Sequence, residues 1–270
     1  FSSSNLKVIP KDMDALKSLL KEKGNFNVHE DIVDENGEQE ATGIYADTTP
    51  DGKVNWNEEN DYETVSPKAE EISKNITLDG KKVSFPMTFS NLGGQYAEFN
   101  NVDFSKLNND KAPFIIENTK TKMNMLILNI DAMPMNATMG FDQEAVIVDL
   151  LGGGTHKISV GINLKDKKII TLSTNGASFS SEKDLKINGI GVGNTFNEMY
   201  AKFGNPVKIQ KNEMGHYTDT MAMYAYTDEK GNMYGAYFVH SDKKFDGTNY
   251  IKTKPNVITA VNVLYFSNNK

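Results

Sequence analysis

Short alternating strands with turn residues between them fill the chain from about Ile76 onward, and they constrain the fold more than any other feature. The clearest strand patterns lie over residues 122–131, 144–151, 157–164 and 168–173. Gly152-Gly153-Gly154 and Lys165-Asp166-Lys167 have the composition of the turns between them. No segment between these strands is long enough for the crossover helix that a parallel pair requires. The sequence therefore predicts antiparallel meanders rather than a doubly wound parallel sheet.

The best-marked helix of the sequence spans residues 195–203. Thr195 and Glu198 have the spacing of a capping box. The apolar stripe behind them consists of Phe196, Met199, Tyr200 and Phe203. Gly204 and Pro206 then end the helix. Four further strands are expected over residues 207–210, 218–226, 232–240 and 257–266.

Two stretches of the sequence follow one plan. Leu78-Asp79-Gly80 is followed by residues 88–92, and Ile187-Asn188-Gly189 is followed by residues 195–199, each leading into a short helix and then strands. We therefore expect an α+β fold built from tandem helix-plus-antiparallel-sheet units with an N-terminal acidic appendage. The expected division is an appendage over residues 1–68, a first unit over 69–182 and a second unit over 183–270.

Charge sets the appendage apart from the rest of the chain. Twelve Asp or Glu and one Lys lie between Glu30 and Glu63, a local balance of −11 in a chain of net charge −7. Residues 10–23, ahead of this segment, have the spacing of a helix. All 29 basic residues are lysine, so the bidentate arginine contacts that read guanine or clamp phosphate are absent. The sequence therefore argues against nucleic acid as a partner.

The cellular compartment is inferred from the N-terminus and from what the composition excludes. Cysteine is absent, which rules out disulfides, thiolate metal sites and a cysteine nucleophile. No apolar run reaches the length of about 18 residues that a membrane helix needs. The chain opens with Phe1-Ser2-Ser3-Ser4-Asn5, as expected if an upstream segment is removed. We expect an exported, extracellular protein attached to the bacterial cell surface, and a lipid anchor upstream of the chain is compatible with this expectation.

A resemblance to known proteins rests on the second unit. The stretch from Ile187 to Lys202, followed by Phe203-Gly204-Asn205-Pro206, resembles the opening of the units that build the β-lactamase-inhibitor-protein-like fold. It is also similar to small envelope lipoproteins of the SmpA/OmlA type. Residues 78–92 resemble segments of uncharacterised secreted proteins of low-GC Gram-positive bacteria. The resemblance implies a helix packed on an antiparallel sheet and a binding or scaffolding role rather than catalysis. Inhibition of a β-lactamase is not implied, because none of that inhibitor's contact residues matches a position here.

Two glycine-rich segments have only a superficial likeness to phosphate-binding loops. Gly189-x-Gly191-x-Gly193 precedes a helix but departs from the G-x-G-x-x-G spacing of dinucleotide-binding folds. Gly152-Gly153-Gly154-Thr155 lacks the Gly-Lys-Ser/Thr ending of a P-loop. Both favour structural turns, and no cofactor is expected.

Histidine and serine give no catalytic motif. The histidines are His29, His156, His216 and His240, and none is spaced for zinc. No G-x-S-x-G nucleophile elbow is present, whereas a triad assembled from dispersed residues stays open. An enzyme is therefore not the favoured interpretation.

Calcium is the one metal for which the sequence offers ligands. Asp31, Asp34, Asn36 and Glu38 cluster around Gly37, and calcium prefers such oxygen ligands. The EF-hand register fails, because Ala41-Thr42-Gly43 stands where the closing Glu is needed. The cluster fits a solvated turn better than a calcium site.

Tyrosines on the expected last sheet are the remaining candidates for a binding surface. Strand alternation places Tyr224 and Tyr226 on the face opposite Met221 and Met223. If the Met, Phe and Leu side chains pack on the helix, the open face carries Tyr224, Tyr226, Tyr237 and Tyr265. Tyrosine combines apolar area with a polar tip and suits protein or glycan contact. The same residues are also ordinary strand formers, so a purely structural role stays open.

The function expected from these observations is a non-catalytic surface binding or scaffolding module of an exported protein. Its partner would be a protein or glycan at the cell surface. The alternative class is a hydrolase acting on cell-wall or dietary polymers with dispersed carboxylates, recognised by two facing carboxylates about 5–10 Å apart. The ligand and the oligomeric state are left open by the sequence.

Overall fold

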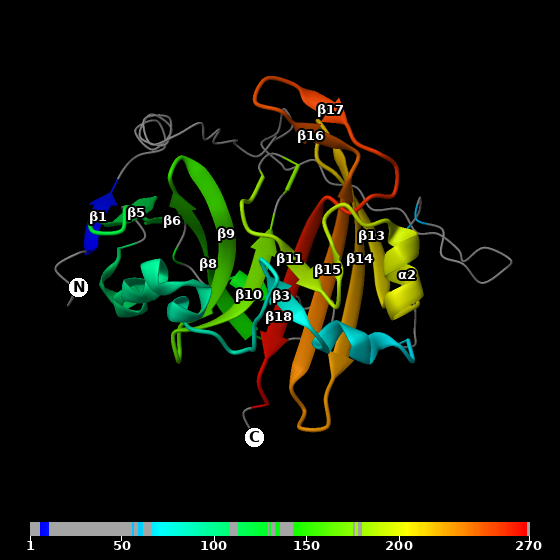
Figure 1. Ribbon diagram of the computed structural model, residues 1–270, viewed down its shortest axis with the longest axis horizontal. Helices are drawn as coiled ribbons and strands as arrows, with labels where there is room; N and C mark the ends of the chain where they lie inside the picture. The colour runs from blue at the N-terminus through cyan, green and yellow to red at the C-terminus, as the bar shows by residue number, and fades with distance from the viewer. Residues whose placement is uncertain are drawn as a thin grey trace, which may run out of the picture. The chain divides into compact units, whose positions relative to one another are not determined.

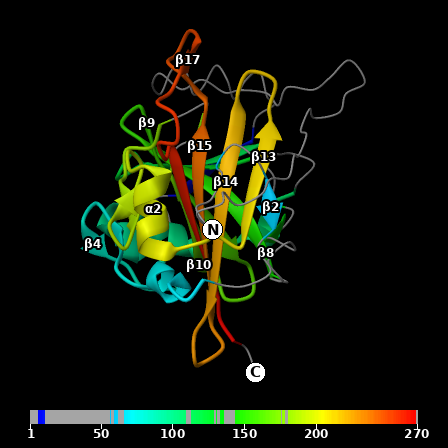
Figure 2. The same cartoon turned by 90° about the vertical axis from the view of Figure 1, so that its right-hand side faces the viewer.

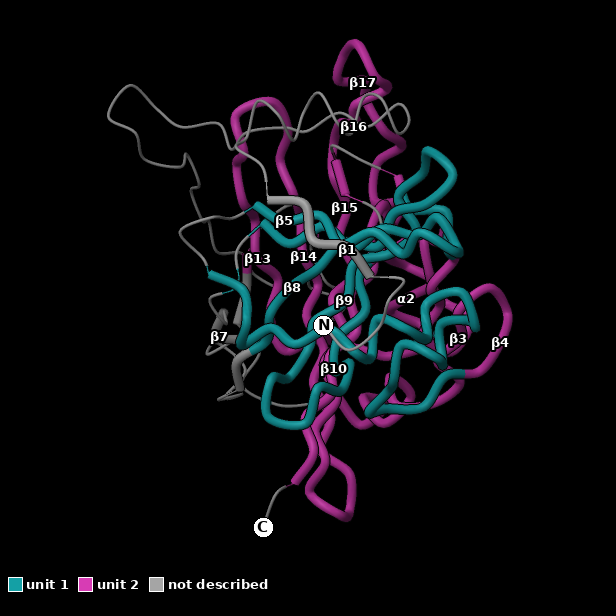
Figure 3. The backbone as a smooth tube through the Cα atoms, turned by 90° about the vertical axis from the view of Figure 1, so that its left-hand side faces the viewer, with its two compact units in different colours: residues 1–28, 83–173, 181–183 teal, residues 29–82, 174–180, 184–270 magenta. Residues whose placement is uncertain are grey.

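The fold is given by a computed structural model that describes residues 6–10, 56, 59–61, 66–108, 113–128, 130, 133–135, 143–174, 176–177 and 180–268. Two compact units are distinguished (Figure 3). Unit 1 comprises residues 1–28, 83–173 and 181–183, and unit 2 comprises residues 29–82, 174–180 and 184–270. These units interleave along the chain and do not follow the continuous segments 1–68, 69–182 and 183–270.

Two features expected in the appendage fall outside this description. The helix expected over residues 10–23 lies outside the described residues, apart from Pro10, which ends a strand. The acidic cluster of Asp31, Asp34, Asn36 and Glu38 also lies outside them. No helix in the described part of the chain is both long enough and apolar enough to span a membrane.

Unit 1 is built on an antiparallel sheet in the order β1-β5-β6-β8-β9-β10, with β7 paired to β8 (Figure 1). The strands are β1 (Leu6–Pro10), β5 (Phe114–Asn118), β6 (Asn124–Ile127), β7 (Met133–Met135), β8 (Gln143–Gly152), β9 (Thr155–Asn163) and β10 (Lys168–Thr174). The four strands predicted from alternation in this part of the chain correspond to β6, β8, β9 and β10, and the antiparallel meander is confirmed. Fully buried side chains such as Ile116, Val148 and Ile162 form its core.

In the described part of unit 1, three short 3-10 helices lie between β1 and β5 in the chain. They are η2 (Phe89–Leu92), η3 (Gly94–Asn101) and η4 (Phe104–Lys106). Phe89 and Phe99 meet edge to face with ring centroids 5.9 Å apart, which joins η2 to η3. Met87 exchanges two backbone hydrogen bonds with Ile169 of β10, of 3.0 and 2.8 Å, and so anchors this segment to the sheet.

In unit 2, strands pair antiparallel in the order β18-β15-β14-β13-β2. These strands are β2 (Asn60–Asp61), β13 (Lys208–Glu213), β14 (Thr218–Thr227), β15 (Met233–Ser241) and β18 (Ala260–Phe266). The four predicted strands are confirmed as β13, β14, β15 and β18. A further hairpin, β16 (Lys243–Phe245) with β17 (Tyr250–Lys252), was not predicted. It lies at the end of the sheet opposite the β14–β15 turn (Figures 1 and 2).

Helix α2 (Phe196–Phe203) lies on one face of β14 and β15, and its predicted ends are confirmed. The Thr195 hydroxyl accepts the Glu198 N–H at 3.1 Å, and the Glu198 carboxylate accepts the Thr195 N–H in return. Gly204 follows the helix with a φ of 74°, a backbone conformation that glycine adopts without strain. Phe203 packs on the sheet with its ring centroid 5.4 Å from that of Phe238.

A four-stranded sheet in unit 2 joins two hairpins of the same design. It has the order β12-β11-β3-β4, with β3 (Ile76–Leu78), β4 (Lys81–Lys82), β11 (Leu185–Ile187) and β12 (Ile190–Gly191). Each hairpin turns through two residues of positive φ, Asp79-Gly80 in one and Asn188-Gly189 in the other. The Asp79 N–H donates to the Asp184 carbonyl at 2.9 Å, and the Asn188 N–H donates to the Asn75 carbonyl at 3.1 Å. These two hydrogen bonds continue the pairing of the central strands β3 and β11 by one residue at each end, so the two hairpins are related in an approximately symmetric way.

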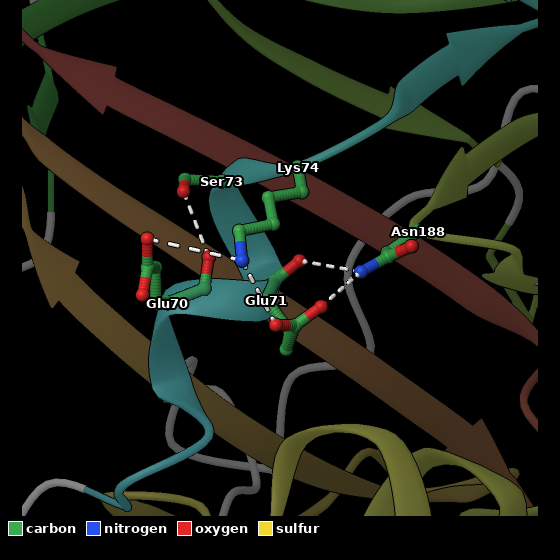
Figure 4. A network of polar contacts seen from close by, with 5 residues as sticks. All are labelled: Glu70, Glu71, Ser73, Lys74 and Asn188. Atoms are coloured by element: carbon green, nitrogen blue, oxygen red, sulfur yellow. Dashed lines mark hydrogen bonds and ion pairs between the residues drawn. The ribbon is translucent and has the colours of Figure 1, made fainter.

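The short helix η1 (Ala69–Ser73) leads into this sheet and is tied to its second turn (Figure 4). The Asn188 side-chain amide donates to the Glu71 carboxylate at 2.8 Å and to its carbonyl at 3.2 Å. The Lys74 ammonium donates to the same carboxylate at 3.0 Å and holds the pKa of Glu71 below its ordinary value. Each charge in this network has a partner, so we interpret the network as structural.

Candidate functional site

Tyr224, one of the four tyrosines predicted to form an open face, is a core residue. Its side chain is 1% exposed and packs against Phe203 of α2, with ring centroids 5.5 Å apart. Its hydroxyl donates to the Gly204 carbonyl at 2.8 Å. The face of β14 that was predicted to be open is therefore the face that the helix covers, and Tyr224 is corrected to a residue that anchors α2.

Tyr237 lies on the opposite face of the same sheet. Its direct cross-strand partner is Met223, whereas Phe238 is paired with Ala222 on the helix-bearing face. Among the described residues, the Tyr237 hydroxyl is buried without a hydrogen-bond partner, and burial raises the pKa of this phenol. The four predicted tyrosines therefore do not share one face.

Tyr226 and Tyr265 lie in one row at the end of the strands next to the β14–β15 turn, with Tyr234 between them. Register places Tyr226, Tyr234 and Tyr265 side by side across β14, β15 and β18. Tyr234 and Tyr265 pack edge to face at 5.2 Å, and burial raises the pKa of both phenols. Tyr265 is only 5% exposed, so this row is a packed ladder rather than an open platform.

At the other end of the sheet, four aromatic side chains from two separate turns form the aromatic cluster. His216 and Tyr217 belong to the β13–β14 turn, and Phe245 and Tyr250 belong to the β16–β17 hairpin. The Tyr250 ring lies parallel to His216, with centroids 4.9 Å apart and planes at 14°. It is also stacked on Tyr217 at 5.7 Å and contacts Phe245 at 5.2 Å. His216 is exposed, and neighbouring Ile251 is 51% exposed.

Backbone hydrogen bonds hold the two turns of the aromatic cluster in place. The Met214 N–H donates to the Tyr217 carbonyl at 2.8 Å, which closes the β13–β14 turn. The Thr253 N–H donates to the Asp242 carbonyl at 3.0 Å and closes the base of the hairpin. The Asp242 carboxylate in turn accepts the Thr218 N–H at 2.7 Å and so joins the hairpin to β14. The stacked rings are therefore presented on a fixed backbone.

Asp219, two residues after Tyr217, has the most perturbed carboxyl group near the cluster. Burial raises its pKa from 3.8 to about 6, and the negative charge of Asp242 adds to the rise. The Ser241 hydroxyl donates to Asp219 Oδ1 at 2.6 Å and favours the ionised form, which reduces the rise. A carboxyl group of this kind occurs often at functional sites, and no sequence motif marks Asp219.

A second polar cluster, in unit 1, surrounds His156. Nδ1 of His156 lies 3.0 Å from the Ser181 hydroxyl, and Nε2 lies 3.3 Å from Asp149 Oδ1. The order Ser–His–Asp is that of a hydrolase triad, but the two ring nitrogens are used in the reverse sense. Asp149 Oδ1 also accepts the Ser159 hydroxyl, and His156 is only 8% exposed.

The surroundings of His156 explain the cluster as a structural link. The Glu182 N–H donates to the His156 carbonyl at 2.8 Å, and the Lys183 N–H donates to the Lys157 carbonyl at 3.2 Å. The Glu182 carboxylate pairs with Lys157 and accepts the Thr155 hydroxyl at 2.5 Å, and these contacts lower its pKa. We therefore interpret the cluster as the link that holds residues 181–183 to β9.

Neither a metal cluster nor a related protein adds to this picture. No group of three or more His, Asp or Glu side chains is placed to hold a metal ion within the described ranges. Comparison of the chain with protein-family models, curated proteins and solved structures gave no match. The aromatic cluster and the groups beside it are therefore the features of the described residues that indicate a function.

Proposed function

We propose that this chain is a non-catalytic binding or scaffolding module of an exported protein, and that the aromatic cluster is its contact surface. The partner would be a protein or glycan at the outside of the bacterial cell. The single observation that supports the proposal is the stack of His216, Tyr217 and Tyr250 against Phe245.

The proposal is supported physically by the free energy gained when aromatic side chains are removed from water. Tyr217, Phe245 and Tyr250 are half-buried, so a molecule that covers the cluster removes further apolar area from water. Aromatic residues on a fixed backbone also lose little conformational entropy on binding, which makes them common anchors at interfaces. The aromatic cluster combines partly exposed apolar area with a fixed backbone.

Replacing the central ring of the cluster tests this proposal. We expect Tyr250→Ala to weaken binding to the native cell-surface fraction by about thirtyfold, because aromatic anchors commonly contribute 2 kcal/mol or more. The matched control is Tyr234→Ala, a half-buried tyrosine at the other end of the sheet, which we expect to bind as the wild type does. Affinity is measured by surface plasmon resonance. Equal affinity of the wild type and a folded Tyr250→Ala variant would show that the contact surface lies elsewhere.

We also propose that residues 69–182 and 183–270 are two helix-and-sheet copies of one plan, in keeping with the resemblance to β-lactamase-inhibitor-protein-like units. The β3–β4 and β11–β12 hairpins support this, because both turn through Asx-Gly and pair with each other through their central strands. Each hairpin is followed by a capping box, Thr88 with Asn91 in one case and Thr195 with Glu198 in the other.

A hydrolase acting on polymers is the second candidate function, and one observation favours it. The pKa of Asp219 is raised to about 6, next to a second carboxylate, Asp242. A carboxylic acid with a raised pKa beside an ionised carboxylate is the arrangement that glycoside hydrolysis uses. Both carboxylates lie next to the aromatic cluster in the chain.

The two candidate functions predict different results with polymer substrates. If the module is non-catalytic, the wild type and Asp219→Asn release no reducing ends from cell-wall or plant polysaccharides above background. A hydrolase would show turnover by the wild type, reduced about 100-fold or more in Asp219→Asn, because the general acid is removed. Reducing-end release, measured from pH 4 to 8, decides between them.

A further inference from the structure

The β16–β17 hairpin is a local concentration of positive charge in a chain of net charge −7. Residues 242–254 contain four lysines and two aspartates, so their net charge is four minus two, or +2. The lysines are Lys243, Lys244, Lys252 and Lys254. Because charges further apart than about 8 Å are screened at physiological salt, this local balance governs what approaches the hairpin.

The two aspartates of the hairpin are engaged by backbone amides rather than by these lysines. Asp242 accepts the Thr218 N–H, as described above, and Asp246 accepts the N–H groups of Thr248 and Asn249, each at 2.8 Å. Within the described residues, Lys243, Lys244 and Lys252 form no ion pair. The positive charge of the hairpin is therefore not neutralised locally.

Lys243 and Lys252 are placed in a way that is unfavourable without an anion. They are direct cross-strand partners, and Phe245 and Tyr250 are the next pair on the same face. Like charges directly opposite each other destabilise a hairpin, and an anionic group bound between them would relieve the repulsion. Lys244, which is paired with Ile251, lies on the opposite face of the hairpin and is not part of this pair.

We propose that the aromatic cluster and the Lys243–Lys252 pair together form one binding site for an anionic carbohydrate polymer. The inference rests on the proposed binding function and names its ligand class. The apolar C–H face of a sugar ring would pack on the aromatic rings, as apolar groups do on exposed aromatic surface. A carboxylate, sulfate or phosphate group on that sugar would accept charge-assisted hydrogen bonds from the two ammonium groups.

An anionic membrane is the competing occupant of a basic, aromatic hairpin, and the turn argues against it. The tip of the hairpin consists of Asp246, Gly247, Thr248 and Asn249, all of them exposed. A hairpin that inserts into the interface of a bilayer needs apolar side chains at its leading end. Here the apolar residues, Phe245, Tyr250 and Ile251, flank the turn instead.

The test compares polymers and variants of the full chain by affinity electrophoresis and isothermal calorimetry. The probes are polygalacturonate, dextran sulfate, phosphorylated dextran, neutral dextran and phosphatidylglycerol vesicles. We expect at least one polyanion to bind, with affinity that falls as salt rises, and neutral dextran to bind at least tenfold more weakly. Lys243→Gln/Lys252→Gln should lose about thirtyfold or more in affinity. Lys120→Gln/Lys165→Gln, which changes two exposed turn lysines of unit 1, should stay within about twofold.

The outcomes separate this inference from the function on which it rests. Equal binding of neutral dextran and the polyanions, lost in Tyr250→Ala, would contradict an anionic ligand and leave the contact surface in place. Binding to none of the three polyanions, or preferential binding to vesicles, would also overturn the inference. Polyanion binding that is unchanged in both the lysine pair and Tyr250→Ala would overturn the inference and the proposed contact surface together.

Discussion

Tyr224→Ala is expected to lower the free energy of unfolding of unit 2 by about 3–5 kcal/mol, the usual cost of emptying an aromatic site in a core. The substitution removes the ring that packs between Phe203 and Phe238, with centroid distances of 5.5 and 6.0 Å. It also removes the hydrogen bond to the Gly204 carbonyl, so Tyr224→Phe should account for about 1 kcal/mol of the loss.

The measurement is urea unfolding followed by the fluorescence of Trp56, the single tryptophan of the chain. Trp56 is buried with its ring centroid 4.9 Å from that of Phe196, so it reports on the packing of α2. Tyr226→Ala, on the same strand and face but only half-buried, is the matched control and should cost about 1 kcal/mol. Similar losses in the two variants would mean that Tyr224 does not anchor the helix.

Asp219→Asn is expected to stabilise the protein at neutral pH and to have little effect in acid. The folded-state pKa of Asp219, about 6, lies above its ordinary value of 3.8, so the folded state binds this proton more tightly. The resulting stabilisation is fully present below pH 3.8 and is lost as pH rises through 6. A pKa difference of about 2 corresponds to about 3 kcal/mol. This is the upper limit of the increase in the free energy of unfolding that we expect for Asp219→Asn near pH 7.

Asparagine keeps the size of the side chain and can still accept the Ser241 hydroxyl, so the change isolates the charge. Stability is measured by Trp56 fluorescence in urea from pH 4 to 8. The exposed Glu229→Gln is the control and should show no gain that grows with pH. A stability difference between Asp219→Asn and wild type that is constant across this range would contradict the raised pKa.

The sequence predicted the elements of unit 2 better than the face that each strand presents. Thr195, Glu198 and Gly204 mark the ends of α2 by local hydrogen bonding and backbone conformation, which depend on neighbouring residues alone. Which face of β14 is covered by α2 depends on tertiary packing instead. Met223 is 4% exposed and Tyr224 is 1% exposed, so both faces of the strand are buried and alternation does not show which one meets the helix.

The candidate site was missed because its residues come from two turns that are distant in sequence. His216 and Tyr217 stand at one end of β14, and the hairpin with Phe245 and Tyr250 follows the end of β15. In an antiparallel meander the start of β14 and the end of β15 lie side by side. The strand order would therefore have placed the β13–β14 turn next to the β16–β17 hairpin. The hairpin itself has strands of three residues with several lysines, too short and too polar for an alternation pattern to identify.

The central claim is that this module binds through the aromatic cluster at the β16–β17 hairpin. Hydrogen–deuterium exchange of the full chain, with and without the native cell-surface fraction, tests it most directly. We predict slower exchange at residues 214–218 and 243–252 in the bound state, with the backbone around the Tyr234–Tyr265 ladder unchanged. Protection that spares both turns of the cluster and appears elsewhere on the chain would contradict the account.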